Sequence, residues 1–317
     1  MPFRMFRDIT ASPITSPVVS TPPHLRLPAG ARAHLLRTSR GPFAVHEAHP
    51  PQGSHPRGTA LLVPGFTGSK EDFLTVLESL SGAGYEVIAI DQRGQYETPG
   101  PDDAEAYSLD ALGADLLAIA ETTGGPVHLV GHSFGGLAVR QATIAAPEAV
   151  ASATLLCSGP GRLSGPSADK LETLIGALTM FSVADIWGVV NATAEANGEH
   201  VGIAPEVLEF LERRFKQTTA QNLATLAAIL LSAEDRTAEL AAAGVPTLVL
   251  WGATDDVWLP GVQADMAARL GAAGVAIEGA GHSPAVENPV GTAAVLMRFW
   301  AGLPTPAKIA ASFDEGP

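Results

Sequence analysis

The chain has 317 residues, of which 46% are hydrophobic and 16% charged, with 33 glycines and 25 prolines. This composition is typical of a globular enzyme and excludes a disordered, coiled-coil or collagen-like chain. The formal net charge is −14, from 19 Lys and Arg against 33 Asp and Glu. This charge argues against a nucleic-acid-binding protein, which needs a basic surface to neutralise phosphates.

The first 40 residues differ from the rest in charge. They hold six arginines, one aspartate and six prolines, and no continuous apolar stretch of the length that a signal peptide needs. We therefore expect residues 1–40 to form a loose, basic, Pro-rich N-terminal arm. Residues 304–317 are expected to form a C-terminal tail.

From residue 43 onward, short runs rich in Val, Ile and Leu alternate with helical patterns. This alternation predicts βα units around a mostly parallel sheet, and the near-continuous hydrophobicity of the runs is typical of strands that helices cover on both faces. The predicted strands are residues 43–47, 59–63, 85–90, 127–131, 153–157, 245–251 and 275–278. The predicted helices are residues 70–81, 109–121, 137–145, 262–270 and 290–300.

A long interval interrupts this alternation between the predicted strands 153–157 and 245–251. It far exceeds the ~10–12 residues that a crossover helix needs, so the sequence predicts an insertion. We expect residues 161–232 to form a helical lid, with helical periodicity at 171–181, 206–215 and 222–231. The α/β core would then comprise residues 41–160 and 233–303. An independent domain is less favoured, because the ends of the insertion do not resemble linkers.

Large side chains of the predicted lid allow two interpretations. Its aromatic residues either line an acyl pocket or pack within the lid; they are Phe181, Trp187, Phe210 and Phe215. Its basic residues either form a solvated helix face, which is the expected role, or contact an anionic substrate; they are Arg213, Arg214 and Lys216.

A candidate nucleophile lies between a predicted strand and a predicted helix. The segment Gly131-His132-Ser133-Phe134-Gly135 has the G-x-S-x-G pattern of a nucleophile elbow, in which a tight turn leaves the serine exposed at the end of the strand. A serine hydroxyl is a poor nucleophile by itself, so this hypothesis also requires a histidine base and an acid that orients it.

Chain order reduces the candidates for both partners. The acid and then the histidine follow the serine in proteins with this elbow, and only His200 and His282 come after Ser133. His200 lies in the predicted lid, whereas His282 follows the last predicted strand. The acid should also follow a strand, and Asp255 or Asp256 meets this condition. One of these two aspartates could instead cap a helix or stabilise a turn.

With these segments in order, residues 43–302 resemble the α/β-hydrolase family, and in particular its lid-bearing serine hydrolases. The resemblance implies an α/β-hydrolase fold, with a mostly parallel central sheet flanked by helices and an inserted helical lid. The segment "WGATDD" matches the family's Gly-x-x-Asp, with Gly252 three residues before Asp255, and the match therefore favours Asp255 as the acid.

Two other segments extend the resemblance. "LLVPGFTGSKEDF" is similar to the family's oxyanion-hole loop, with Pro64 where a histidine is usual, and implies that the backbone N–H groups of Phe66 and Phe134 hold the oxyanion. "IDQRGQYETPG" is similar to the loop after the next strand, with Gln95 where a glycine is common.

These features predict a carboxylesterase-like serine hydrolase that acts on a small-molecule substrate with an ester-like carbonyl, an ester or lactone, through an acyl-enzyme. The same triad serves carbon–carbon, amide or peptide, and thioester hydrolysis as well as perhydrolysis, and a non-catalytic ligand-binding protein is the alternative from another class. Ser133 disfavours the family members whose nucleophile is an aspartate. No Gly-rich phosphate loop or metal-ligand pattern is present, so the sequence predicts no cofactor and no metal.

Two further features bear on location. The longest clean apolar run, residues 223–231, is shorter than the ~18–20 residues that span a bilayer, so we expect no membrane span and a soluble protein. The single cysteine, Cys157, allows no intrachain disulfide and is expected to be a buried small hydrophobe. Together these features favour the cytoplasm. The sequence carries no signal for an oligomeric state.

Overall fold

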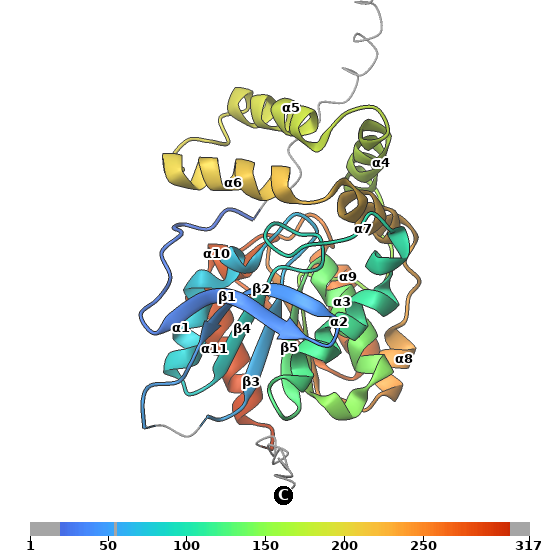
Figure 1. Ribbon diagram of the computed structural model, residues 1–317. Helices are drawn as coiled ribbons and strands as arrows, with labels where there is room; N and C mark the ends of the chain where they lie inside the picture. Colours follow the sequence, from blue (N-terminus) through green and yellow to red (C-terminus); the bar gives the residue numbers. More distant parts are fainter. Residues whose placement is uncertain (1–19, 54–55, 305–317) are drawn as a thin grey trace, which may run out of the picture.

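The computed structural model describes residues 20–53 and 56–304, and its centre is an eight-stranded sheet (Figure 1). Residues 1–19 of the predicted N-terminal arm and residues 305–317 of the predicted C-terminal tail lie outside the described residues. The strands are β1 Ala31–Thr38, β2 Gly41–Ala48, β3 Thr59–Val63, β4 Glu86–Ile90, β5 Val127–His132, β6 Val150–Leu156, β7 Thr247–Gly252 and β8 Ala273–Ile277.

The strand order is β1-β2-β4-β3-β5-β6-β7-β8. β1 pairs with β2, and β2 with β4, in antiparallel fashion, whereas all pairs from β4 to β8 are parallel. Every residue of the central strands β3 and β5 is buried, because helices cover both faces of a parallel sheet. The predicted fold class, a mostly parallel α/β sheet, is therefore confirmed.

The expectation of a loose arm over residues 1–40 is wrong for residues 31–38, which form the edge strand β1. Its register pairs Ala31 with Ala48 and Thr38 with Gly41, which makes β1 and β2 a hairpin with a short turn. Burial alternates along most of β1, because one face of this edge strand is exposed to solvent. Of the arginines that indicated an arm, Arg32 and Arg37 lie on this edge strand, where Arg32 pairs with Glu47 at 2.7 Å.

Helices cover the two faces of the sheet. Figure 1 shows α1 beside α11 on one side and α2 beside α3 on the other, and both pairs are in contact. The helices of this core are η3 Lys70–Phe73, α1 Leu74–Gly82, η4 Ala104–Tyr107, α2 Leu109–Glu121, α3 Phe134–Ala145, η5 Pro147–Ala149, α8 Thr237–Ala242, α9 Pro260–Leu270, α10 Pro284–Glu287 and α11 Pro289–Ala301.

Between β6 and β7 the chain forms a helical insertion, which lies over one end of the sheet in Figure 1. Its helices are α4 Pro166–Leu178, α5 Val183–Ala196, α6 Pro205–Gln217 and α7 Ala220–Ser232. Helical periodicity in the sequence predicted the other three helices, but not α5. The capping box of Ser182 and Asp185 at the start of α5 was the available signal.

The insertion contributes to two hydrophobic clusters. Side chains of α5, α6 and the start of α7 form a cluster of their own. In contrast, Leu226, Ala227 and Leu230 of α7 belong to the main core of the sheet. Helix α7 is thus packed as part of the core, whereas α5 and α6 pack mainly on each other. Within the described residues, no helix is both long and apolar enough to cross a membrane.

Candidate active site

Ser133 lies in a tight turn between β5 and α3. Its backbone has φ 53° and ψ −120°, a left-handed conformation that costs energy for a residue with a side chain and often occurs at functional sites. The flanking glycines permit this turn: a Cβ at Gly131 would lie 2.3 Å from the carbonyl O of Gly135, and a Cβ at Gly135 would lie 2.5 Å from that of Pro64. Only glycine fits at these two positions.

The structure brings Ser133, His282 and Asp255 together, although they are far apart in the sequence. His282 Nε2 lies 3.0 Å from Ser133 Oγ, and His282 Nδ1 lies 2.9 Å from Asp255 Oδ1. All three side chains are buried. They follow β5, β8 and β7 respectively, and the carboxyl ends of parallel strands meet at one edge of a sheet. His200, the other histidine after Ser133, lies in the helical insertion.

Asp255 rather than Asp256 faces the histidine. Asp256 is exposed, whereas Asp255 Oδ1 also accepts a hydrogen bond from the N–H of Val257 at 3.0 Å, and its Oδ2 accepts one from Gln263 Nε2 at 2.8 Å. These donors fix the carboxylate in a single orientation toward His282. Gln263 was not predicted from the sequence, because no motif connects the first turn of α9 to the acid.

His132 fixes the loop that carries His282. Burial, together with the neighbouring His282, lowers the pKa of His132 to about 4, so its imidazole is neutral at pH 7. His132 Nε2 lies 2.6 Å from the carbonyl O of His282, and a neutral imidazole protonated at Nε2 can donate this hydrogen bond. His132 thus links the turn of Ser133 to the backbone of the histidine loop.

The two backbone N–H groups expected to bind an oxyanion come from different segments, the start of α3 and the loop after β3. Phe134 is the first residue of α3, where an N–H has no partner within the helix. Phe66 follows β3 and packs against both hydrophobic clusters. In the described part of the chain, neither of these N–H groups donates a hydrogen bond to another residue. Both are therefore available to an oxygen of a substrate.

The four aromatic residues proposed for a pocket have two different environments. Trp187, Phe210 and Phe215 are buried in the cluster that α5 and α6 form, and the rings of Trp187 and Phe215 lie 5.3 Å apart. Phe181 lies outside this cluster and is 43% exposed. For the three buried rings, the structure favours packing within the insertion over lining of a pocket.

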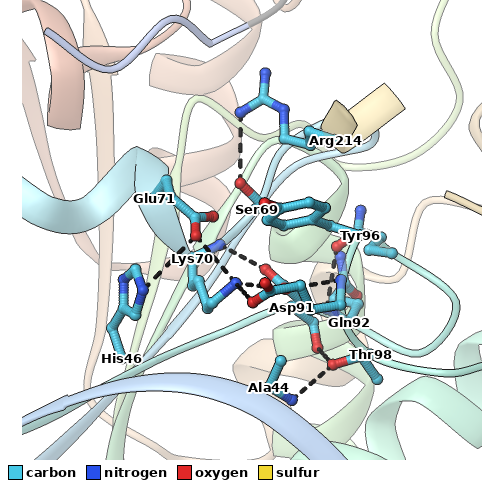
Figure 2. A network of polar contacts seen from close by, with 12 residues as sticks. Ala44, His46, Ser69, Lys70, Glu71, Asp91, Gln92, Tyr96, Thr98 and Arg214 are labelled. Atoms are coloured by element: carbon cyan, nitrogen blue, oxygen red, sulfur yellow. Dashed lines mark hydrogen bonds and ion pairs between the residues drawn. The ribbon is translucent and has the colours of Figure 1, made fainter. Parts of the chain in front are cut away.

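The expected solvated face of α6 is wrong for Arg214, which is only 1% exposed in its side chain and donates to Asp72 Oδ1 at 2.8 Å. In Figure 2, Arg214 approaches Ser69 from the insertion, and their contact is 3.5 Å long. Arg214 is buried because α6 turns this side chain toward the loop after β3. The sequence pattern of consecutive basic residues could not distinguish it from its exposed neighbour Arg213.

A buried ion pair joins the loops that follow β3 and β4. Lys70 Nζ donates to Asp91 Oδ2 at 2.9 Å, and its backbone N–H donates to Oδ1 at 2.8 Å (Figure 2). Burial alone would lower the pKa of Lys70, but Asp91 and Glu71 raise it above its usual range. Lys70 is therefore charged at every pH of interest, and the pair holds the two loops together beside the edge that carries Ser133.

Two groups of side chains have atoms close enough to share a metal ion. Ligand atoms of Cys157, Asp255 and His282 lie within 4.8 Å of one another. So do those of a second group at the end of β2 and the start of β4, which comprises Glu47, His49 and Glu86. In the first group burial raises the pKa of the Cys157 thiol well above its usual value, which disfavours the thiolate that binds metals. The buried position of Cys157 agrees with its predicted role as a small hydrophobe.

Residues 60–295 match the family model described as the alpha/beta hydrolase family. The curated protein named "Putative carbamate hydrolase RutD" from Variovorax paradoxus (strain S110) is 31% identical over 218 residues, which cover 68% of this chain and 79% of that protein. The segment that matches the family model, residues 60–295, includes the loops described above that follow strands β3 to β8.

Solved structures share the fold of this chain. A hydrolase from Pseudomonas aeruginosa PA01 superimposes with a TM-score of 0.68 at 24% identity, covering 86% of this chain and 99% of the other. The enol-lactonase from Burkholderia xenovorans LB400 has a TM-score of 0.68 at 18% identity, covering 84% of this chain and 100% of the other.

Proposed function

This chain belongs to the α/β hydrolase family, and from that premise we propose that it is a carboxylesterase-like serine hydrolase that cleaves a carboxylic ester or lactone through an acyl-enzyme. The observation that carries the proposal is the continuous chain of hydrogen bonds from Ser133 through His282 to Asp255. Such a chain is what a serine needs in order to lose its proton as it attacks.

In the first half of the proposed reaction, Ser133 Oγ forms a bond to the carbonyl carbon of the substrate. The proton of the hydroxyl passes to His282 Nε2, and Asp255 holds the opposite proton on Nδ1 and stabilises the imidazolium. The carbonyl oxygen becomes an oxyanion that accepts hydrogen bonds from the N–H groups of Phe66 and Phe134. Collapse of this intermediate transfers the proton from His282 to the leaving alcohol.

In the second half, water takes the place of the alcohol. His282 removes a proton from the water, the resulting hydroxide attacks the acyl carbon, and the acid leaves as Ser133 recovers its proton. The described residues supply every proton acceptor and donor that these steps require. The pathway therefore needs no group beyond the protein, the ester and water.

An ester or lactone is proposed because it is the easiest acyl transfer for this set of groups. We further propose that the helical insertion acts as a lid that selects among substrates, since it lies over the end of the sheet where Ser133 follows β5. A cytoplasmic location, which the single Cys157 favours, stays a prediction.

A screen of p-nitrophenyl esters of increasing acyl length, with lactones alongside, tests the proposal. Wild type should hydrolyse at least one of these substrates, and Ser133→Ala should lower kcat by about 10³-fold or more. Ser133→Ala should leave the fold intact, because it removes only one buried hydroxyl. Wild-type turnover in Ser133→Ala would contradict the mechanism.

A second candidate is hydrolysis of a carbamate, with amide, thioester and carbon–carbon substrates as further members of the same mechanistic class. The observation that favours it is the 31% identity to the protein named a carbamate hydrolase. The same triad would attack a carbamate carbonyl, and an amine would leave after protonation by His282. Carbamate and amide substrates in the same screen distinguish the two candidates by their relative kcat/KM.

A further inference from the structure

Two glutamines hold three consecutive carbonyl groups of the loop that carries Phe66. Gln92 Nε2 donates to the carbonyl O of Pro64 at 2.9 Å, and Gln95 Nε2 donates to those of Gly65 and Phe66 at 2.8 and 3.0 Å. The Gln95 side chain is fully buried, and its Oε1 accepts a hydrogen bond from the N–H of Gln92 at 3.1 Å. These contacts fix the orientation of the loop's backbone.

The orientation of the Gly65 carbonyl also determines that of the next N–H. The peptide between Gly65 and Phe66 is trans, so its C=O and N–H point in opposite directions. Because the carbonyl points to Gln95, the N–H of Phe66 points away from Gln95. The same glycine lies against the candidate nucleophile: a Cβ at Gly65 would come 3.1 Å from the Cβ of Ser133.

We propose that Gln95 is a positioning residue of the oxyanion site, which turns the Gly65–Phe66 peptide so that the Phe66 N–H faces the oxygen of a carbonyl bound at Ser133. This inference rests on the proposed function and deepens it. Gln95 would act through the backbone and would not touch the substrate. Its role explains why a large polar side chain occupies a position where the family commonly has glycine.

An amide suits this position for chemical reasons. Two carbonyl oxygens can only accept hydrogen bonds, and the NH₂ group of glutamine offers two hydrogens, while its oxygen is satisfied by Gln92. A methionine has a similar length but no donor, and an ionised glutamate would place negative charge against two carbonyls. In this loop the residue with a left-handed backbone is Tyr96, which follows Gln95 and has φ 40°. The backbone conformation of Gln95 therefore does not require glycine.

The test compares Gln95→Met with wild type in hydrolysis of p-nitrophenyl acetate and in inhibition by a trifluoromethyl ketone. Ser133 Oγ adds to the ketone carbon, its proton passes to His282, and the ketone oxygen becomes an oxyanion. We expect kcat to fall by roughly 10- to 100-fold with little change in KM, since displacing a donor costs less than the about 10²- to 10³-fold lost on removing one. The ketone's inhibition constant should rise by a similar factor.

Two further variants separate positioning from general damage. Gln92→Met removes the hydrogen bond to the carbonyl O of Pro64, one peptide earlier. That bond orients the N–H of Gly65 rather than that of Phe66, so its loss should reduce kcat less. Gln95→Glu keeps the shape of the side chain; its activity relative to wild type should rise as the pH is lowered, because the protonated carboxyl donates one hydrogen bond. Titration of active sites corrects each rate for the folded fraction.

Several results would contradict the proposed role of Gln95. Wild-type kcat and ketone affinity in both Gln95 variants would overturn it, as would equal losses in Gln92→Met and Gln95→Met with unchanged ketone affinity. If Gln95→Met does not fold, Gln95→Glu decides alone. In that case, a ratio of its ketone inhibition constant to that of wild type that does not change with pH would contradict the proposal. A wild-type protein that neither hydrolyses the ester nor binds the ketone would instead refute the proposed function, and this inference with it.

Discussion

Arg214 of α6 and Asp72 of η3 form a buried ion pair with a distance of 2.8 Å between Nη1 and Oδ1. Asp72 Oδ2 also accepts a hydrogen bond from the N–H of Ser69 at 3.2 Å, in the loop that carries Phe66. Arg214 Nη2 donates to the carbonyl O of Ser20, whose Oγ lies 2.8 Å from Ser283 Oγ, next to the histidine. One guanidinium therefore joins the helical insertion to the loop that carries Phe66 and, through Ser20, to the loop that carries His282.

The first prediction concerns this pair. Arg214→Met should lower the free energy of unfolding by about 3–5 kcal/mol at pH 7, since it leaves the buried Asp72 without its partner, and folding must then either bury an unpaired charge or take up a proton. Lys216→Met on the same helix removes an exposed partner of Glu212 and should cost less than about 1 kcal/mol. Denaturant unfolding of the two variants measures both values.

The loss in Arg214→Met should also depend on pH. Burial raises the pKa of Asp72 to about 6 even though Arg214 lowers it, so removal of Arg214 raises this pKa further. The difference in stability between wild type and Arg214→Met should then shrink from pH 7 to pH 5, where protonation discharges Asp72. Equal costs for the Arg214 and Lys216 variants would contradict the buried ion pair.

A second prediction concerns His128, which stacks on Trp300 and has Nδ1 2.8 Å from Ser152 Oγ. Burial lowers its pKa from 6.5 to about 4. Between these pH values the unfolded chain binds a proton that the folded chain does not, so His128 lowers the free energy of unfolding as the pH falls.

The variant His128→Gln keeps a polar partner for Ser152 but does not titrate. Its stability should therefore fall less than that of wild type between pH 6.5 and 4, by about 2–3 kcal/mol, because one pKa unit corresponds to about 1.4 kcal/mol. Unfolding curves measured across this range give the two slopes. Parallel slopes would show that folding does not lower the pKa of His128.

The third prediction separates the adjacent aspartates. Asp255→Asn should lower kcat by about 10²- to 10⁴-fold, because an asparagine no longer holds His282 in the required tautomer. Asp256→Asn alters an exposed side chain and should leave kcat close to wild type. Steady-state kinetics on the best ester provide the ranking, and the opposite order would assign the acid to Asp256.

The fourth prediction tests the role of the insertion. Phe210 is buried in the cluster of α5 and α6, and its ring lies 5.6 Å from that of Tyr96. Phe210→Ala should destabilise the insertion by about 3–5 kcal/mol through the cavity it leaves, and should change the relative kcat/KM along an acyl-length series. Phe181→Ala, at an exposed position, is the matched control. Unchanged relative values in Phe210→Ala would exclude the insertion as a determinant of substrate size.

The sequence predicted the elements whose signal is local and strong. Residues 59–63 and 109–121 have their predicted bounds, because a continuous buried strand and a capped amphipathic helix are visible in a short window. The edge strand β1 was missed, since it buries one face only and carries the arginines that indicated a loose arm. Its partner β2, which lies inside the sheet, was predicted.

The candidate site shows the same division. Ser133, His282 and the pair of aspartates follow from a motif, chain order and the position of loops after strands. Gln95, Gln263 and Arg214 could not be predicted, because each acts on backbone or side chains that only the tertiary structure brings near. A buried polar side chain has no signal in sequence periodicity that distinguishes it from an exposed one.

The most direct test of the account is the reaction of the intact protein with a fluorophosphonate, followed by mass spectrometry. If Ser133 is the nucleophile, each protein molecule should gain one phosphonyl group with loss of fluoride, and the modified peptide should contain Ser133. His282→Ala should slow this labelling by about 10³-fold, since the serine loses its base. A modification at another residue, or labelling of Ser133→Ala at the wild-type rate, would contradict the assignment of Ser133.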